Sequence, residues 1–188
     1  NAYNTAIGTD AGLSVTTGIN NTLSGALAGD ALTDADYNVA VGVSSLTSDT
    51  LGSRSTAIGT NALFSQNFGT ATDTYNTAVG FEAGAAVTTG IQNTLIGGLA
   101  GDALTTGKQN VAIGYHALGS DDVGQKTVAI GEGALFTQNY ATATDSYNTA
   151  VGYNVGNAVT TGVQNVLIGG LAGDSLTDAD FNVAVGTA

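Results

Sequence analysis

The sequence of 188 residues lacks cysteine, proline, methionine and tryptophan, and only 10% of its residues are charged. Without cysteine the chain can form no disulfide framework. Three basic residues, Arg54, Lys108 and Lys126, stand against 15 acidic ones, which gives a net charge of −12. Three isolated cations cannot neutralise a row of phosphates, so we expect no nucleic-acid partner and no attachment to anionic lipid. No apolar run reaches the roughly 20 residues of a membrane helix, and we expect no membrane insertion of this segment.

Glycine, with 28 residues, and a recurring five-residue phrase are what the sequence has in abundance. The phrase is a polar residue, Thr or Val, Ala or Leu, usually Ile or Val, and Gly, and it begins at residues 4, 21, 38, 55, 76, 93, 110, 127, 148, 165 and 182. The steps are 17, 17, 17 and 21 residues, repeated. Such a period is typical of a solenoid, in which each repeat is one rung on its neighbours. The sequence therefore predicts an all-β fold, a parallel β-solenoid (β-roll or β-helix) of 17- and 21-residue rungs.

The longer period is also regular. Residues 4–75 align with 76–147, and 148–188 begin a third copy, so one super-repeat has 72 residues. We expect one solenoid over residues 1–188, with about two short strands in each rung. At ~4.8 Å per rung, eleven rungs make a rod of roughly 50 Å. Because the chain starts and stops within the repeat, we expect it to be a fragment of a longer fibre.

The two faces of the predicted strand are both apolar. Successive side chains of a strand point to opposite faces, so the second and fourth residues of the phrase share one face and the third takes the other. Strands that are apolar on both faces are typically covered on both sides. A solenoid covers only the inner face, and another copy of the chain is the simplest cover for the outer one. The pattern favours a homotrimer, in which small residues (Ala6, Ala40, Ala57, Ala112) allow close approach of the copies.

Two positions of the phrase are predicted to build the scaffold. The fifth is glycine in every rung, which predicts a corner with positive φ or close packing on the next rung. These structural glycines are Gly8, Gly25, Gly42, Gly59, Gly80, Gly97, Gly114, Gly131, Gly152, Gly169 and Gly186. The first is Asn in nine of the eleven rungs, with Ser55 and Thr127 as exceptions. We expect the Asn side chains to hydrogen-bond to one another along the axis.

The residues do not indicate an enzyme. The single histidine, His116, occupies a variable place in its rung, which predicts a solvated side chain, and no Gly-x-Ser-x-Gly elbow is present. Nothing fixes a nucleophile or a general acid. We expect no catalytic residues and no cofactor.

Acidic turns are the candidate metal sites. Asp34 and Asp36, like Asp178 and Asp180, place oxygens at alternate positions, as a calcium loop does at its start. The glycine and the closing glutamate of such a loop are missing, and the middle copy carries Lys108 instead. We therefore expect no metal site, although the sequence leaves calcium binding open. Three aspartates recur in every copy and are predicted to cap turns: Asp30, Asp102 and Asp174.

The 21-residue rungs are the best candidates for ligand binding, because their extra residues come with aromatic ones. These are Phe64, Phe68, Tyr75, Phe136, Tyr140 and Tyr147. One interpretation is a projection that stacks on sugars, repeated along the rod for avidity. The other, which we favour, is that the rings fold back to cap the wider rung or fill the seam between copies. Adjacent threonine pairs, such as Thr88 and Thr89, make an ice-binding solenoid a remote third possibility, since the two side chains point to opposite faces.

The Val-Ala-Ile-Gly rungs at 111–114 and 128–131 resemble the head repeats of YadA-like trimeric autotransporter adhesins. The ordinary rung, such as residues 76–90, looks even more like the repeat arrays of phage and prophage tail fibre proteins. Both resemblances imply a trimeric, non-catalytic rod outside the cell, on a virion tail or a bacterial surface. They imply that the rod spaces a receptor-binding tip from its base, and that its partners are its own copies and, where it is adhesive, host-surface glycans.

Overall fold

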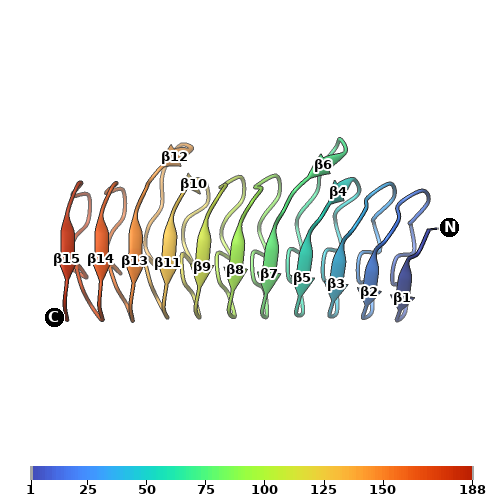
Figure 1. Ribbon diagram of the computed structural model, residues 1–188, viewed down its shortest axis with the longest axis horizontal. Helices are drawn as coiled ribbons and strands as arrows, with labels where there is room; N and C mark the ends of the chain where they lie inside the picture. The colour runs from blue at the N-terminus through green and yellow to red at the C-terminus, as the bar shows by residue number, and fades with distance from the viewer. Residues whose placement is uncertain (1, 188) are drawn as a thin grey trace.

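The computed structural model describes residues 2–187, and it confirms an all-β parallel β-solenoid of about eleven turns (Figure 1). No helix occurs among these residues. One strand from each turn enters a single sheet of eleven parallel strands, whose order in space is the order of the chain. Its strands are β1 (Thr5–Ile7), β2 (Thr22–Ser24), β3 (Val39–Val41), β5 (Thr56–Ile58), β7 (Thr77–Val79), β8 (Thr94–Ile96), β9 (Val111–Ile113), β11 (Val128–Ile130), β13 (Thr149–Val151), β14 (Val166–Ile168) and β15 (Val183–Val185).

The register of the main sheet stacks equivalent residues of the repeat. Thr5 lies opposite Thr22, and Thr56 lies opposite Thr77, across the longer connection. Because the strands all point the same way, the turns that precede them line up along one edge of the rod and the turns that follow them along the other (Figure 1). We call these the upper and the lower edge, as they lie in Figure 1.

After each strand of the main sheet the chain runs back to the upper edge, and we call this side of the solenoid the return wall. It consists mostly of turns, so the expectation of a second strand in every rung is wrong. Within residues 2–187, short strands of this wall form only beside the 21-residue connections, where β4 (Gly52–Ser53) pairs with β6 (Thr72–Asp73) and β10 (Gly124–Gln125) with β12 (Thr144–Asp145). Elsewhere residues with left-handed backbone, such as Leu27 (φ 60°) and Leu99 (φ 58°), interrupt any extended run. Backbone hydrogen bonds still join the rungs, as from Gly12 N to Ala28 O (3.0 Å).

The core is a thin layer between the two walls. The third residue of the strand phrase points inward, so that Ala40, Ala57 and Ala112 are fully buried inside their own solenoid. The sequence analysis placed these alanines, with Ala6, between copies of the chain. That assignment is wrong for the three buried ones, because the inward face of the strand belongs to the core of its own chain.

Leucine fills the core wherever the strand carries it. Leu95 is fully buried and reaches the return wall, where a Cβ on Gly84 or Gly101 would lie 2.6 or 2.8 Å from its methyl groups. Leu23 and Leu167 meet Gly29 and Gly173 in the same way. The glycines of the return wall therefore form hollows that receive these leucines.

The glycine that ends each strand of the phrase turns the chain out of the sheet. Gly42 has φ 135°, and a Cβ there would lie 2.5 Å from the carbonyl oxygen of Gly59 in the next rung. A side chain is excluded by the backbone angle and by the stacked neighbour alike.

The asparagines form a ladder whose side chains bond mainly to backbone, and only Asn182 Nδ2 donates to the side chain of another ladder asparagine, Asn165 Oδ1 (3.0 Å), among the described residues. Asn21 Nδ2 donates to Ala35 O (2.7 Å) across its own rung, and Asn21 Oδ1 accepts the backbone N–H of Asn38 (2.9 Å) in the next. Both asparagines are buried. Each side chain thus satisfies a carbonyl and an N–H that the turn would otherwise leave unpaired.

Candidate functional site

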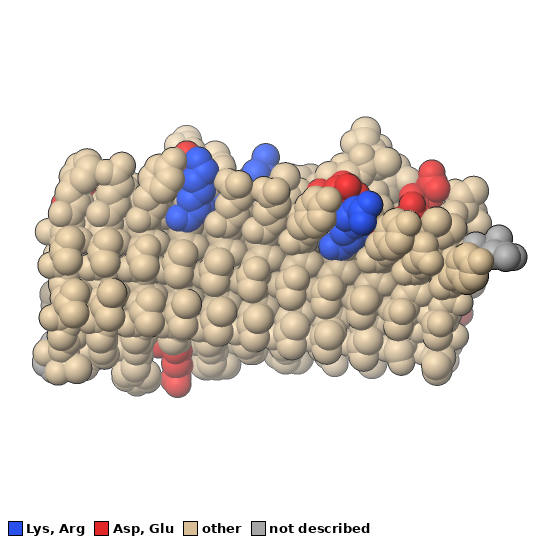
Figure 2. Space-filling model, viewed as in Figure 1, with Lys and Arg blue, Asp and Glu red and all other residues tan. Residues whose placement is uncertain are grey.

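The outer face of the main sheet carries mainly Ile, Val and Thr side chains and is incompletely covered. The second and fourth residues of the phrase point outward, and Ile58, Ile96 and Ile168 are 37–40% exposed. None of the outward residues in the eleven strands is charged. Figure 2 views the rod from this side, and the charged side chains lie toward its upper and lower edges. We call this surface the sheet face.

A buried polar cluster replaces part of the apolar core at each 21-residue rung. In the first copy, Gln66 Nε2 donates to Asp49 Oδ2 (2.6 Å) and to Ser55 Oγ (2.8 Å), and Gln66 Oε1 accepts from Asn76 Nδ2 (2.8 Å). The Ser55 hydroxyl also pairs with that of Thr74 at 2.6 Å. All five side chains are buried, and burial raises the pKa of the Asp49 carboxyl above its ordinary value of 3.8.

The second copy repeats the cluster with conservative changes. Gln138 Nε2 donates to Asp121 Oδ2 (2.7 Å) and Thr127 Oγ1 (3.1 Å), while Asn148 Nδ2 donates to Gln138 Oε1 (2.8 Å). Burial again raises the pKa of the aspartate, here Asp121. The groups are paired within the chain, so the cluster orders the wider rung and presents no open site.

Two of the six aromatic residues predicted to bind sugars are buried. Phe68 is 6% exposed and Tyr140 is 5% exposed. The Tyr140 hydroxyl donates to Gly162 O (2.9 Å) and accepts from Asn148 Nδ2 (3.2 Å), and burial raises its pKa. These two rings fill the interior of the wider rung, as in the interpretation that we favoured, and offer no face to a ligand.

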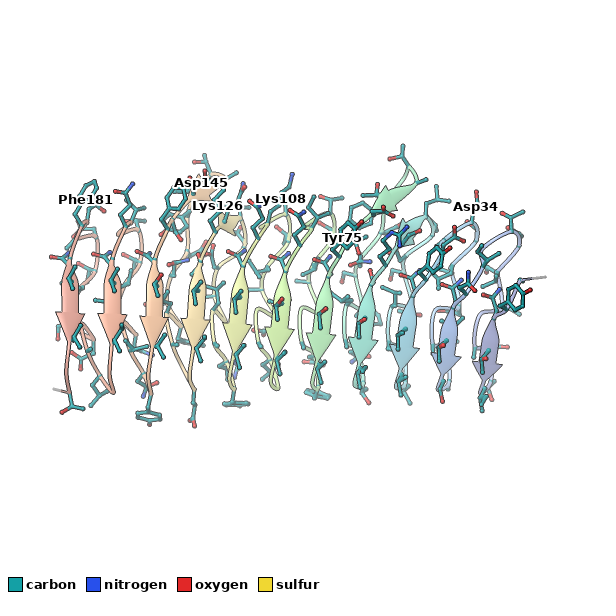
Figure 3. All side chains as sticks on the ribbon, viewed as in Figure 1. Asp34, Tyr75, Lys108, Lys126, Asp145 and Phe181 are labelled. Atoms are coloured by element: carbon teal, nitrogen blue, oxygen red, sulfur yellow. The ribbon has the colours of Figure 1, made fainter. Side chains whose placement is uncertain are left out.

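Two others, Tyr75 and Tyr147, are half exposed on the upper edge, where Figure 3 labels Tyr75, Lys126 and Asp145. Lys126 Nζ lies 2.5 Å from Asp145 Oδ2 and 5.1 Å from the centre of the Tyr147 ring. In the first copy Arg54 pairs instead with Asp73 (3.0 Å). The interaction with Lys126 lowers the pKa of Asp145. Each super-repeat thus places a tyrosine, a cation and a carboxylate together.

The last two, Phe64 and Phe136, line two hollows that lie between the rungs. Phe64 borders a hollow of about 440 Å³ with Asn61, Glu82 and Asp102. Phe136 borders one of about 190 Å³, which Glu132, Asn154 and other residues complete. Phe64 and Phe136 therefore both adjoin a concave surface.

His116 is not a freely solvated side chain, contrary to expectation. It lies in the wall of the smaller hollow, between the rings of Tyr115 (centroids 4.4 Å apart) and Phe136 (5.5 Å). Its Nδ1 atom is buried and has no hydrogen-bond partner. Flanking rings from its own and the next rung hold the imidazole in place.

The acidic turns bind backbone and hydroxyl groups of the neighbouring rungs. Asp36 Oδ1 accepts the N–H of Ile19 (2.7 Å), and Asp180 Oδ1 accepts that of Val163 (2.8 Å). Of the aspartates predicted to cap turns, Asp30 accepts from the Thr47 hydroxyl of the next rung. Over residues 2–187 no three His, Asp or Glu side chains gather in a way that could hold a metal ion.

Asp102 lacks the partner that Asp30 has. One super-repeat along, Gly119 stands where Thr47 is, and Asp102 Oδ1 is buried without a hydrogen bond. Burial raises the pKa of this carboxyl. Asp102, which lines the same hollow as Phe64, therefore has one carboxylate oxygen without a hydrogen bond.

Fold and surface define the class as a parallel β-solenoid repeat protein. No protein-family model matches the chain, and no curated protein or solved structure matches it. Within the described residues no helix is long and apolar enough to cross a membrane.

Proposed function

We propose that the chain is a non-catalytic structural segment of an extracellular attachment fibre, a homotrimeric rod of 17- and 21-residue rungs. The observation that carries the proposal is the sheet face: a continuous uncharged surface, rich in Ile and Val, over eleven stacked strands. A surface of this length and polarity is typical of an interface. In a phage tail fibre or a surface adhesin, such a rod would space a receptor-binding tip from its base.

The occupant of the sheet face that fits best is the same chain. Its rows of outward residues repeat at every rung, so a parallel copy offers rows of the same spacing along the whole rod. With a net charge of −12, copies repel one another except where they meet on uncharged surface. The two outward residues of each strand form two rows along the sheet. Each chain of a cyclic trimer has two neighbours, so each row can contact one neighbour. The resemblance to trimeric adhesin heads and tail fibres also supports three copies.

The oligomeric state of this chain tests the proposal. Sedimentation equilibrium should give the mass of a trimer for the native chain, and Ile96→Asp with Ile113→Asp should shift it toward monomer. Thr70→Asp, in the exposed part of the 21-residue connection, is the matched control and should leave the trimer intact. A native chain that stays folded and monomeric at high concentration would refute the proposed assembly.

A carbohydrate-binding adhesin is the second candidate function. Its support is that four of the six aromatic residues of the 21-residue rungs keep accessible rings, two on the upper edge and two beside the hollows. In this case the rod itself, and not a tip, would carry the affinity.

A further inference from the structure

A second set of aromatic residues occupies the lower edge, outside the positions that the 21-residue rungs add. Phe81, Tyr115 and Tyr153 each follow the glycine that ends a strand, in the rungs of β7, β9 and β13. They are 55%, 54% and 55% exposed. The rungs between them carry Gly98 and Glu132 at this place, so rings recur at every second rung.

Gly98, between Phe81 and Tyr115, leaves room for the Tyr115 ring to lie along the rod. A Cβ on Gly98 would be 3.6 Å from Cδ2 of Tyr115, which places the ring beside that bare backbone. At ~4.8 Å per rung, successive rings are about 10 Å apart. The result is a periodic row of three aromatic rings, with bare backbone at Gly98 between the first two and the Glu132 side chain between the last two.

Polar groups with free capacity border this row. The hollow of about 190 Å³ is lined by Tyr115 itself, together with Glu132 and Asn154 from the next two rungs. The hollow of about 440 Å³ is lined by Asn61, Glu82 and Asp102. Carboxylates accept hydrogen bonds and amides both donate and accept them, which suits a ligand rich in hydroxyl groups.

Asp102 lines the larger hollow and His116 the smaller one, and each has one buried atom without a hydrogen bond, Oδ1 and Nδ1 respectively. An unsatisfied buried polar atom destabilises a protein, so native structures normally provide a partner for each. Gly119 removes the hydroxyl that satisfies the equivalent aspartate in the first copy. Both atoms have almost no accessible surface, so the polar groups that a ligand in the hollows can reach are those of side chains such as Glu82, Glu132 and Asn154.

We propose that this lower-edge strip, made of Phe81, Tyr115, Tyr153 and the two adjoining hollows, binds an extended, uncharged polysaccharide that lies along the rod. Aromatic rings stack on the apolar faces of sugars, and a β-linked extended glycan turns the same face to the protein at every second sugar. A row of rings at every second rung fits that repeat. The acidic groups in the strip and the net charge of −12 exclude polyanionic glycans.

The inference is independent of the homotrimer, since the strip lies on an edge and the sheet face is a separate surface. It extends the carbohydrate-binding candidate by assigning the glycan class and a different set of residues. Under it, Tyr75 and Tyr147 on the upper edge are not needed for binding.

Binding of cellohexaose and of chitohexaose to the native chain, followed by isothermal titration calorimetry, tests the strip. We expect at least one of the two hexasaccharides to bind. Tyr115→Ala with Tyr153→Ala should weaken that binding on the order of tenfold for each ring. The conservative pair Tyr115→Phe with Tyr153→Phe keeps the rings and should bind within about twofold of the native chain. Tyr75→Ala with Tyr147→Ala is the matched upper-edge control and should bind like the native chain.

The proposal is overturned if neither hexasaccharide binds, if only a polyanion such as alginate binds, or if the lower-edge alanine pair binds like the native chain. Loss of binding in the upper-edge pair alone would also overturn it and move the site to Tyr75 and Tyr147. Circular dichroism and sedimentation of the same samples show whether fold and oligomeric state are unchanged. Failure of the strip is thereby distinguished from failure of the proposed trimer.

Discussion

Within a super-repeat, the second rung fills the core with different side chains from those of the third and fourth rungs. In the second rung of each unit a leucine of the strand, Leu95 in the middle copy, crosses the core into the glycine hollows of the return wall. In the third and fourth rungs the strand carries alanine, and the return wall supplies the bulk through Leu118 and Leu135, both fully buried. Beside them lies the polar cluster of Asp121 and Gln138. The large buried side chain thus comes from the main sheet in the second rung and from the return wall in the third and fourth rungs.

The comparison shows how a thin core tolerates a buried carboxylate. Asp49 is held by Gln66 and by the backbone N–H groups of Gly52 (3.0 Å) and Phe68 (3.3 Å). A Cβ on Gly52 would lie 2.1 Å from Asp49 Oδ2, so the return strand comes close because it is glycine. The polar rungs depend on a complete set of partners, whereas the leucine rungs depend on shape.

The largest effect should come from breaking the leucine layer. Leu95→Ala removes three buried carbon atoms, Cγ and the two Cδ methyl groups, at a site bounded by glycine backbone that cannot move in to fill the space. We expect the free energy of unfolding to fall by about 4 kcal/mol, toward the upper end for such substitutions. Leu99→Ala in the return wall of the same rung, a less buried leucine, is the control and should cost about 1 kcal/mol. Urea denaturation measures both, and equal losses would contradict a specific role for the glycine hollows.

Breaking the polar cluster should have a somewhat smaller effect. Gln66→Leu keeps the volume but deprives Asp49 Oδ2, Ser55 and Asn76 of their partner. Unsatisfied buried groups of this kind should lower the free energy of unfolding by about 3 kcal/mol. Asp49→Leu together with Gln66→Leu removes the carboxylate as well and should recover part of the loss. A double variant less stable than the single one by the full cost of a second substitution would show that the two residues do not act as a pair.

Much of the scaffold could be predicted from the period alone, because the equal spacing of the phrase determines which residues stack. Alternation of strand side chains separates the third position from the second and fourth, but it does not say which face is inward, and Ala40, Ala57 and Ala112 were therefore assigned to the wrong face. The corner follows from the invariant glycine of the phrase, which can take a positive φ. The second strand in each rung was a wrong prediction, since left-handed residues such as Leu27 and Leu99 look like ordinary apolar residues in the sequence. The backbone targets of the asparagines also required knowledge of how two adjacent rungs face each other.

The polar cluster was missed for a different reason. Asp49 and Gln66 occupy a place in the rung where other rungs have Leu32 or Val87, and an isolated polar residue there looks like an exposed one. A signal was present: Ser55 and Thr127 replace the ladder asparagine, each with a glutamine eleven residues later. The aromatic row carries no length signal in the sequence, because Phe81, Tyr115 and Tyr153 lie in rungs of ordinary length.

The smallest effect should be the pH dependence that the polar clusters add. Burial raises the native pKa of Asp49 and Asp121 above the ordinary value of 3.8, so the native chain holds these protons more tightly than the unfolded chain does. The stability from these groups is therefore fully present below 3.8 and is lost as the pH rises through the native pKa. Asp49→Asn with Asp121→Asn cannot titrate there. Urea denaturation of both chains between pH of about 7 and about 4 should show the native chain gaining stability relative to the variant as the pH falls. A constant difference, or one that shrinks toward acid, would mean that the two carboxyls are no easier to protonate in the fold than in the unfolded chain.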